Sequence, residues 1–75
     1  MVSLDQVGVG QQAIVERIDG DDTVVQRLFE MGLLEGEPVE VLAYAPLGDP
    51  LEIRIRDYRL SLRRNEAARV IVRKA

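Results

Sequence analysis

The sequence contains neither cysteine nor histidine. Without cysteine, the chain can form no disulfide, thiolate nucleophile or zinc-ribbon motif. Without histidine, it lacks the commonest general base and the commonest side-chain ligand of transition metals. We therefore expect a protein that is stabilised by packing alone and that holds no cofactor. We also expect no enzymatic activity of its own, because the chain offers no set of acid, base and nucleophile.

Aromatic residues are scarce as well: the chain has one phenylalanine, two tyrosines and no tryptophan. Proteins that bind single-stranded nucleic acid stack bases on aromatic side chains, and domains that bind proline-rich peptides need an aromatic-lined groove. The isoelectric point near 4.8 is also far from the basic values of nucleic-acid-binding domains. Both functions are therefore disfavoured, and we expect no nucleic-acid partner.

Long apolar runs are absent too. No stretch approaches the ~20 residues that cross a bilayer, and the start Met-Val-Ser-Leu-Asp lacks the basic and apolar blocks of a signal peptide. We expect a cytoplasmic protein without direct membrane insertion. The 75 residues, 47% hydrophobic and 31% charged, suit one ordered domain over residues 1–75.

The net charge of −3 conceals an uneven distribution. Residues 1–50 carry two bases against ten acids, a net of −8, whereas residues 51–75 carry eight bases against three acids, a net of +5. Such a chain either steers a charged partner or pairs its two halves internally. We favour internal pairing, with Glu40 and Glu52 meeting arginines that alternate outward on neighbouring strands.

Local patterns predict five strands and one helix. The strands are expected at residues 12–18, 39–45, 51–56, 59–63 and 69–73, the alternation of 51–56 being the clearest. The helix is expected over 23–31, with Thr23 and Gln26 as a capping box and Gly32 ending it. A proline-bounded loop covers 46–50, a hairpin turn lies at 57–58, and 64–68 form a single helical turn. The tail at 74–75 is expected to fray.

Side-chain alternation predicts which residues of each strand share a face. In the first strand, Ile14 and Ile18 share one face, opposite Ala13, Val15 and Arg17. In the second strand, the residues expected on one face are Val39, Val41, Ala43 and Ala45.

These elements predict an all-β fold, a small β-barrel with one inserted helix. About five short strands in so few residues favour a closed barrel, because closure removes exposed sheet edges. An SH3-like and an OB-like barrel fit the pattern equally, and the pattern leaves the strand order open.

Three segments resemble the FeoA family, the small component that accompanies the ferrous-iron transporter FeoB in bacteria. Residues 27–36, Arg-Leu-Phe-Glu-Met-Gly-Leu-Leu-Glu-Gly, resemble its Arg-Leu-x-x-Met-Gly-Leu-x-x-Gly signature. Residues 45–50, Ala-Pro-Leu-Gly-Asp-Pro, are similar to its hairpin loop, and 60–63 with Glu66-Ala67 resemble its Leu-Ser-Leu-Arg strand and trailing Glu-Ala. The first strand is less diagnostic.

The resemblance implies an SH3-like barrel and a role in ferrous-iron uptake. It implies a FeoB-like membrane GTPase as partner, a monomer or weak homo-oligomer, and at most weak binding of transition metal ions. A proline-stiffened loop would present Leu47 at little ordering cost, and one of the two leucines after the helix could remain on the surface. The candidate partner-binding residues are Arg27, Glu30, Leu33, Leu34, Leu47, Asp49, Arg63 and Arg64.

Two other functions stay open. A related module occurs at the C-terminus of DtxR-like metal-dependent repressors, which suggests a metal-responsive regulatory domain. Alternatively, Arg63 or Arg64 inserts into a partner GTPase and accelerates hydrolysis. Asp19, Asp21 and Asp22 could form a loose oxygen site for a metal, but they lack the spacing of a calcium loop, and capping of the following helix explains them better.

Overall fold

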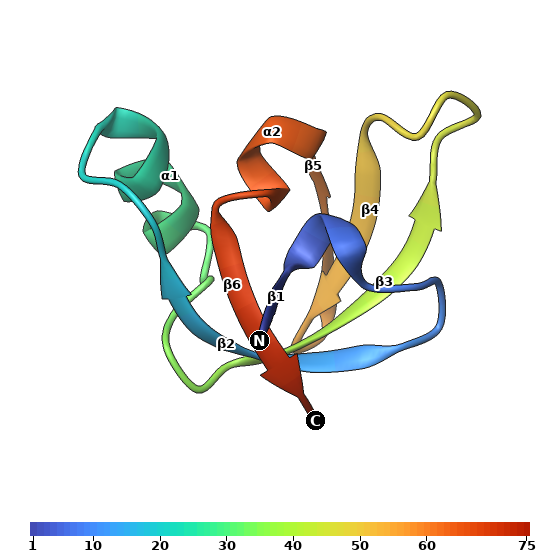
Figure 1. Ribbon diagram of the computed structural model, residues 1–75, viewed down its shortest axis with the longest axis horizontal. Coiled ribbons are helices and arrows are strands. Elements are labelled where there is room, and N and C mark those ends of the chain that lie inside the picture. Colours follow the sequence, from blue (N-terminus) through green and yellow to red (C-terminus); the bar gives the residue numbers. More distant parts are fainter.

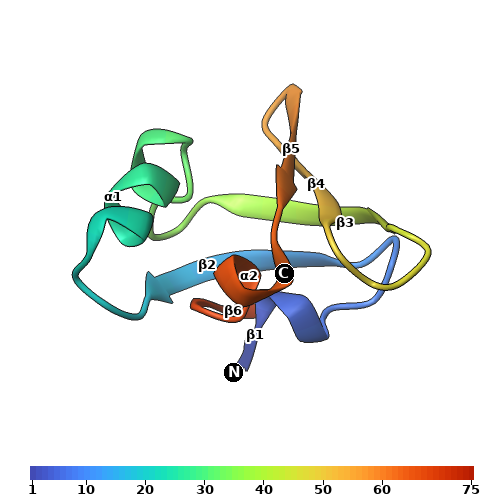
Figure 2. The ribbon, with the colours of Figure 1, turned by 90° about the horizontal axis from the view of Figure 1, so that it is seen from above.

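The computed structural model describes residues 1–75, which form one antiparallel sheet of six strands (Figure 1). The strands are β1 (Val2–Ser3), β2 (Gln12–Ile18), β3 (Pro38–Tyr44), β4 (Leu51–Ile55), β5 (Tyr58–Leu62) and β6 (Val70–Lys74). The helices are the 3-10 helix η1 (Leu4–Gln6) and the α-helices α1 (Thr23–Glu30) and α2 (Arg64–Ala67). The order in the sheet is β1-β6-β2-β3-β4-β5, and β5 runs at a steep angle to β2 and β3 because the sheet curls (Figure 2).

The all-β prediction with one inserted helix is therefore confirmed, with one additional strand. The two-residue β1 pairs with β6 and makes six strands where about five were expected. No helix is long and apolar enough to cross a membrane.

The core is a single cluster of 17 buried apolar side chains from nearly every element. Strand β4 supplies Leu51, Ile53 and Ile55, all inaccessible to solvent, as their strict alternation predicts. Leu28 of α1 and Leu33, just beyond it, join the same cluster. The helix thus packs on the curled sheet instead of lying free of it.

Two β-bulges correct the predicted faces. In β2 the register shifts between Val15 and Arg17, so that Ala13, Val15 and Ile18 are buried together while Ile14 is only half-buried. In β3 it shifts between Val41 and Ala43. The extra residue of a bulge reverses the alternation, so Ala43 is exposed and Tyr44 turns toward the core.

Several predicted boundaries are wrong by about one residue. The β4–β5 turn consists of residues 56–57, with Ile55 paired to Tyr58, so Tyr58 begins a strand instead of closing a turn. Arg56 takes the positive φ of 55° that this tight turn requires. Strand β6 reaches Lys74, which pairs with Ala13 and therefore does not fray.

Helix α1 also begins differently from the predicted capping box. Asp22 is the N-cap, and its carboxylate accepts a hydrogen bond from the Val25 backbone N–H at 3.3 Å. Thr23 is the first helical residue. The acidic residue before the helix therefore satisfies one of the free N–H groups of the first turn, as side chains at this position commonly do.

Candidate functional site

Three segments far apart in the sequence lie at one end of the molecule. They are α1, α2 and the loop of residues 45–50 between β3 and β4, with α2 in the middle (Figure 1). The chain termini lie toward the opposite end (Figure 1). Most of the residues that the sequence singles out belong to these three segments, and we call this surface the helical end.

Glu66 joins the two α-helices. It is the only charged residue among the buried ones, with 9% of its surface exposed. One carboxylate oxygen accepts a hydrogen bond from the Arg63 backbone N–H at 2.9 Å, which caps α2. The other forms an ion pair with Arg27 of α1. Because buried carboxylates need such partners, this residue fixes α2 against α1.

The loop of residues 45–50 is tied to α2. The Asp49 carboxylate accepts a hydrogen bond from the Arg64 backbone N–H at 2.9 Å, and the Arg64 guanidinium donates to the Gly48 carbonyl at 3.2 Å. Arg63 lies 4.0 Å from the same aspartate. Inside the loop, the Gly48 N–H donates to the Ala45 carbonyl at 2.7 Å. The loop is therefore ordered before any partner arrives.

Tyr44 lies beneath this arrangement. The Arg64 guanidinium carbon is 5.7 Å from the centre of its ring, within the range of a cation–π contact. The phenol donates to the backbone carbonyl of Val7 at 2.6 Å. Burial raises the pKa of Tyr44 above its ordinary value, so the phenol stays protonated and keeps its role as a donor.

The structure divides the apolar candidates. Leu47, at the tip of the loop, is 96% exposed and touches little of its own chain. Leu34 is 45% exposed, whereas Leu33 is completely buried in the core. The expectation that Leu33 contacts a partner is therefore wrong, because burial leaves it no surface to offer.

The polar candidates also separate into two groups. Arg27, Asp49, Arg63 and Arg64 come together through Glu66 and the loop contacts, which the sequence spacing alone does not reveal. Glu30 is exposed at the last position of α1 and stays outside this network.

The sequence does not predict a functional role for three further residues. Glu66 reads as part of a trailing motif, although its position three residues after the α2 cap is typical of a capping glutamate. Phe29 fits the apolar stripe of α1 yet remains half-exposed. Tyr58 reads as a turn residue, but its phenol donates to the Met31 carbonyl at the end of α1.

Gly32 makes that last contact possible. Its φ of 102° ends the helix in the left-handed region, and a Cβ atom there would stand 2.5 Å from the Tyr58 phenol oxygen. The half-exposed side chains of Phe29, Leu34 and Tyr58 thus lie near the carboxyl end of α1. They add apolar surface around that end of α1.

Ion pairs show how the acidic and basic halves of the chain are arranged. Eight are present, including Glu40 with Arg54 at 3.5 Å and Glu52 with Arg59 at 3.8 Å on neighbouring strands. Five of the eight join an acid of residues 1–50 to an arginine of residues 51–75, so the two halves pair internally, as predicted. The Arg69 guanidinium, bonded to the Asp22 carboxylate, holds the pKa of Asp22 below its usual range, and Arg56 does the same for the pKa of Glu37.

The arrangement at the helical end is suited to binding. Arg27 and Arg63 are engaged by carboxylates, and Arg64 is held between Tyr44 and the loop. No group of three or more acidic side chains approaches closely enough to hold a metal ion. What the surface offers a partner is a rigid apolar tip, a neighbouring apolar patch and arginines between them.

Comparison with protein families gives one match over nearly the whole chain. The model described as "FeoA domain" matches residues 2–74. A curated relative from Porphyromonas gingivalis is 41% identical over 69 residues, which is 92% of this chain. It is described as a fusion of Fe(2+) transport protein A with the Fe(2+) transporter FeoB, and the chain spans only 8% of its length.

Solved structures agree on the fold. FeoA of Stenotrophomonas maltophilia, described as a prokaryotic SH3 domain protein and complexed with zinc, is 33% identical with a TM-score of 0.84, over 96% of this chain and 89% of that one. The predicted SH3-like barrel is thereby confirmed. A manganese-dependent transcriptional repressor also superimposes, with a TM-score of 0.90 at 18% identity, over 99% of this chain and 36% of the repressor. At that identity the likeness concerns the fold alone.

Proposed function

Because this chain belongs to the FeoA family, whose members are accessories of ferrous-iron transport, we propose that it binds the cytoplasmic region of a FeoB-like membrane GTPase and supports Fe²⁺ uptake. It acts as a binding protein in the cytoplasm and catalyses no reaction. The observation that carries this proposal is the relative in which both components are one polypeptide. Covalent fusion keeps two components at high effective concentration, which benefits partners that work in contact.

The helical end is the surface that suits such a partner. Leu47 stands almost fully exposed on a loop that is already ordered by Asp49 and Arg64, so little conformational entropy is lost when it enters a pocket. Fully buried apolar anchors surrounded by polar contacts dominate the energy of most protein interfaces. Leu47 has the position of an anchor, and the arginines around it supply polar contacts.

Leu34 and Phe29 extend the same surface toward α1. Both are close to half-exposed and have no polar function that would explain their position. Arg27, also on α1, is connected to α2 by its ion pair with Glu66. A partner that covers the loop and both helices would bury apolar surface at two places with a charged region between.

Acceleration of GTP hydrolysis by an inserted arginine gains no support. Such an arginine must leave its own protein and enter the partner's phosphate site. Arg63 faces Asp49, and Arg64 is bonded to Gly48 and lies over Tyr44. The regulatory alternative rests on a likeness of fold alone.

The test is a binding titration between the purified chain and the cytoplasmic region of the FeoB-like transporter from the same organism. We expect Leu47→Asp to weaken binding about tenfold or more, since it removes an apolar anchor and introduces an unpaired charge. Val9→Asp is the matched control. Val9 is also exposed but lies in the turn before β2, outside the helical end.

Circular dichroism would establish that both variants fold. Absence of binding by the wild-type chain would end the proposal, and so would unchanged Fe²⁺ uptake in cells that lack the protein. Equal affinities of Leu47→Asp and Val9→Asp would remove the helical end as the contact surface.

A further inference from the structure

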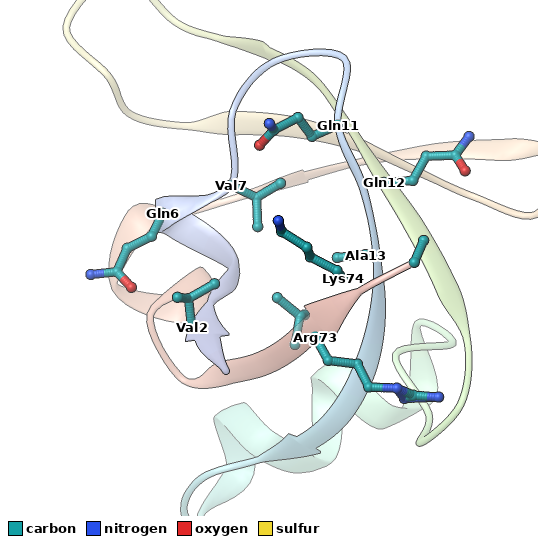
Figure 3. A pocket seen from close by; sticks show the side chains of 10 residues that line it. Val2, Gln6, Val7, Gln11, Gln12, Ala13, Arg73 and Lys74 are labelled. Carbon is teal, nitrogen blue, oxygen red and sulfur yellow. The ribbon is translucent and has the colours of Figure 1, made fainter.

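A hollow of about 420 Å³ opens at the end of the molecule away from α1 and α2. It lies between η1, the turn before β2 and the last residues of β6 (Figure 3). Five apolar residues line it, of which Val7, Ala13 and Val72 are buried and Val2 and Ala75 are exposed. The volume falls in the lower part of the range for small-ligand sites, so it suits one group about the size of an amino acid.

Lys74 occupies an unusual position in this hollow. Along β6, residues 70, 72 and 74 share one face, and Val70 and Val72 of that set are core residues. Lys74 therefore continues the face of two buried valines at the end of the strand, where its own side chain is exposed to solvent. Its partner across the ladder is Ala13, whose small side chain leaves the space open. Figure 3 shows the lysine amine directed among Val7, Val2 and Ala13.

The ammonium group of Lys74 has no carboxylate partner in the fold. None of the ten residues that line the hollow is an aspartate or a glutamate. The adjacent Arg73 contributes to the lining, but its guanidinium points away from the hollow (Figure 3) and forms an ion pair with Glu16 at 2.9 Å. Eight of the ten cationic side chains form ion pairs with acids, whereas Lys74 does not. Lys74 thus gives the hollow a cationic side chain that no acidic side chain neutralises, above an apolar floor.

Glutamine amides complete the rim. The side-chain oxygen of Gln11 accepts a hydrogen bond from the Gly8 N–H at 2.9 Å, which fixes the amide and leaves its NH₂ group free to donate. Gln6 and Gln12 also line the hollow. The polar groups at the mouth can therefore donate hydrogen bonds next to the lysine ammonium, which favours an acceptor that carries negative charge.

We propose that this hollow, which we call the Lys74 pocket, binds an aliphatic carboxylate. The acid group would reach the Lys74 ammonium and the amide of Gln11, while a short branched chain covers Val2, Val7 and Val72. A carboxyl-terminal leucine or valine of a polypeptide carries this chemistry, as does a small free acid. The proposal does not rest on the function assigned to the helical end.

The test is a titration of the isotope-labelled chain, followed by NMR amide shifts, with N-acetyl-leucine and with a tetrapeptide ending in free leucine. We expect shifts confined to residues around 6–13 and 72–75. N-acetyl-leucinamide, which lacks the charge, should bind about tenfold more weakly, because a charge-assisted hydrogen bond is lost. Binding of the acid alone identifies a small molecule as the ligand, and binding of the peptide alone identifies a polypeptide end.

Charge variants at neighbouring positions distinguish binding in the pocket from non-specific attraction of an anion to the positively charged strand. Lys74→Gln should weaken binding about tenfold and Lys74→Arg should largely restore it. Arg73→Gln removes the same charge one residue away and should leave the affinity unchanged. A lysine at this position can also serve only to discourage pairing at a sheet edge. In that case the acid and the amide bind equally or not at all, or Lys74→Gln matches Arg73→Gln, and each of these results would overturn the proposal.

Discussion

At the scale of single residues, the side chains that decide the local structure are often charged and partly exposed. Asp22 caps α1 and receives two hydrogen bonds from Arg69, at 3.2 and 2.9 Å. Glu37 is bonded to Arg56 at 2.7 Å across the β3–β4 pair. The sequence indicates that acids precede the helix, but it gives no sign of Arg69, because that residue is 47 positions away.

These two carboxylates predict how the stability depends on pH. The hydrogen bonds from Arg69 and Arg56 lower the pKa of Asp22 and of Glu37 in the folded chain, below the ordinary values of 3.8 and 4.5. A lowered folded pKa adds stability that is complete above about pH 4.5 and is lost as the pH falls through the folded pKa. We expect the urea concentration at the unfolding midpoint, measured from pH 7 down to pH 2, to decrease once the pH drops below about 4.5.

Substitutions identify the source of that loss. The double variant Asp22→Asn with Glu37→Gln should be less stable than the wild type at pH 7 and should lose less on acidification. Glu35→Gln, at an exposed acid without an ion pair, serves as the control. A double variant with the same acid-induced loss as the wild type would contradict the explanation.

At the scale of elements, alternation predicts strands well and registers poorly. The buried face of Leu51–Ile55 is predicted correctly because every second residue is apolar and no bulge interrupts the strand. In β2 and β3 a bulge reverses the alternation midway, and nothing local in residues 12–18 or 38–44 marks its place. Bulges are decided by how the sheet must bend, which is a property of the neighbouring strands.

Contacts between helices are the other feature that local patterns miss. Glu66 of α2 and Arg27 of α1 meet only because both helices lie on the same end of the curled sheet. We expect Glu66→Gln to lower the free energy of unfolding by about 1–3 kcal/mol, since a buried charged acceptor is lost from both the α2 cap and the ion pair.

Chemical denaturation with urea measures this effect. Glu30→Gln is the matched control, because Glu30 is an exposed glutamate on α1 without an ion pair. Its stability should stay close to that of the wild type. If both variants unfold at the same urea concentration, Glu66 does not join the helices.

At the scale of the whole molecule, the sequence predicts the fold class and part of the site. The motifs at residues 27–36 and 45–50 mark two segments of the helical end, and Leu47 is indeed exposed there. Burial of Leu33 could not be foreseen, since both leucines after α1 are equally apolar and only packing separates them. The Lys74 pocket leaves no motif, because its residues come from both ends of the chain.

The two surfaces lie at opposite ends and use different residues, so we expect them to respond independently. Leu47→Asp should abolish most transporter binding and leave the affinity for N-acetyl-leucine unchanged, because no lining residue of the pocket belongs to the helical end and distant sites usually behave additively. Lys74→Gln should do the reverse. Both affinities can be measured on the same two protein preparations, and a variant that weakens both interactions equally would argue for a single shared site or for misfolding.

One side chain nevertheless touches both ends. The Tyr44 phenol is bonded to the Val7 carbonyl, beside the Lys74 pocket, while its ring lies under Arg64 of the helical end. The chain has no tryptophan, and Tyr58 is the only other tyrosine. With Tyr58 changed to Phe, all tyrosine emission would come from Tyr44. We therefore expect this single tyrosine to act as an optical reporter, its emission changing when binding at either end alters its contact with Arg64 or with the Val7 carbonyl.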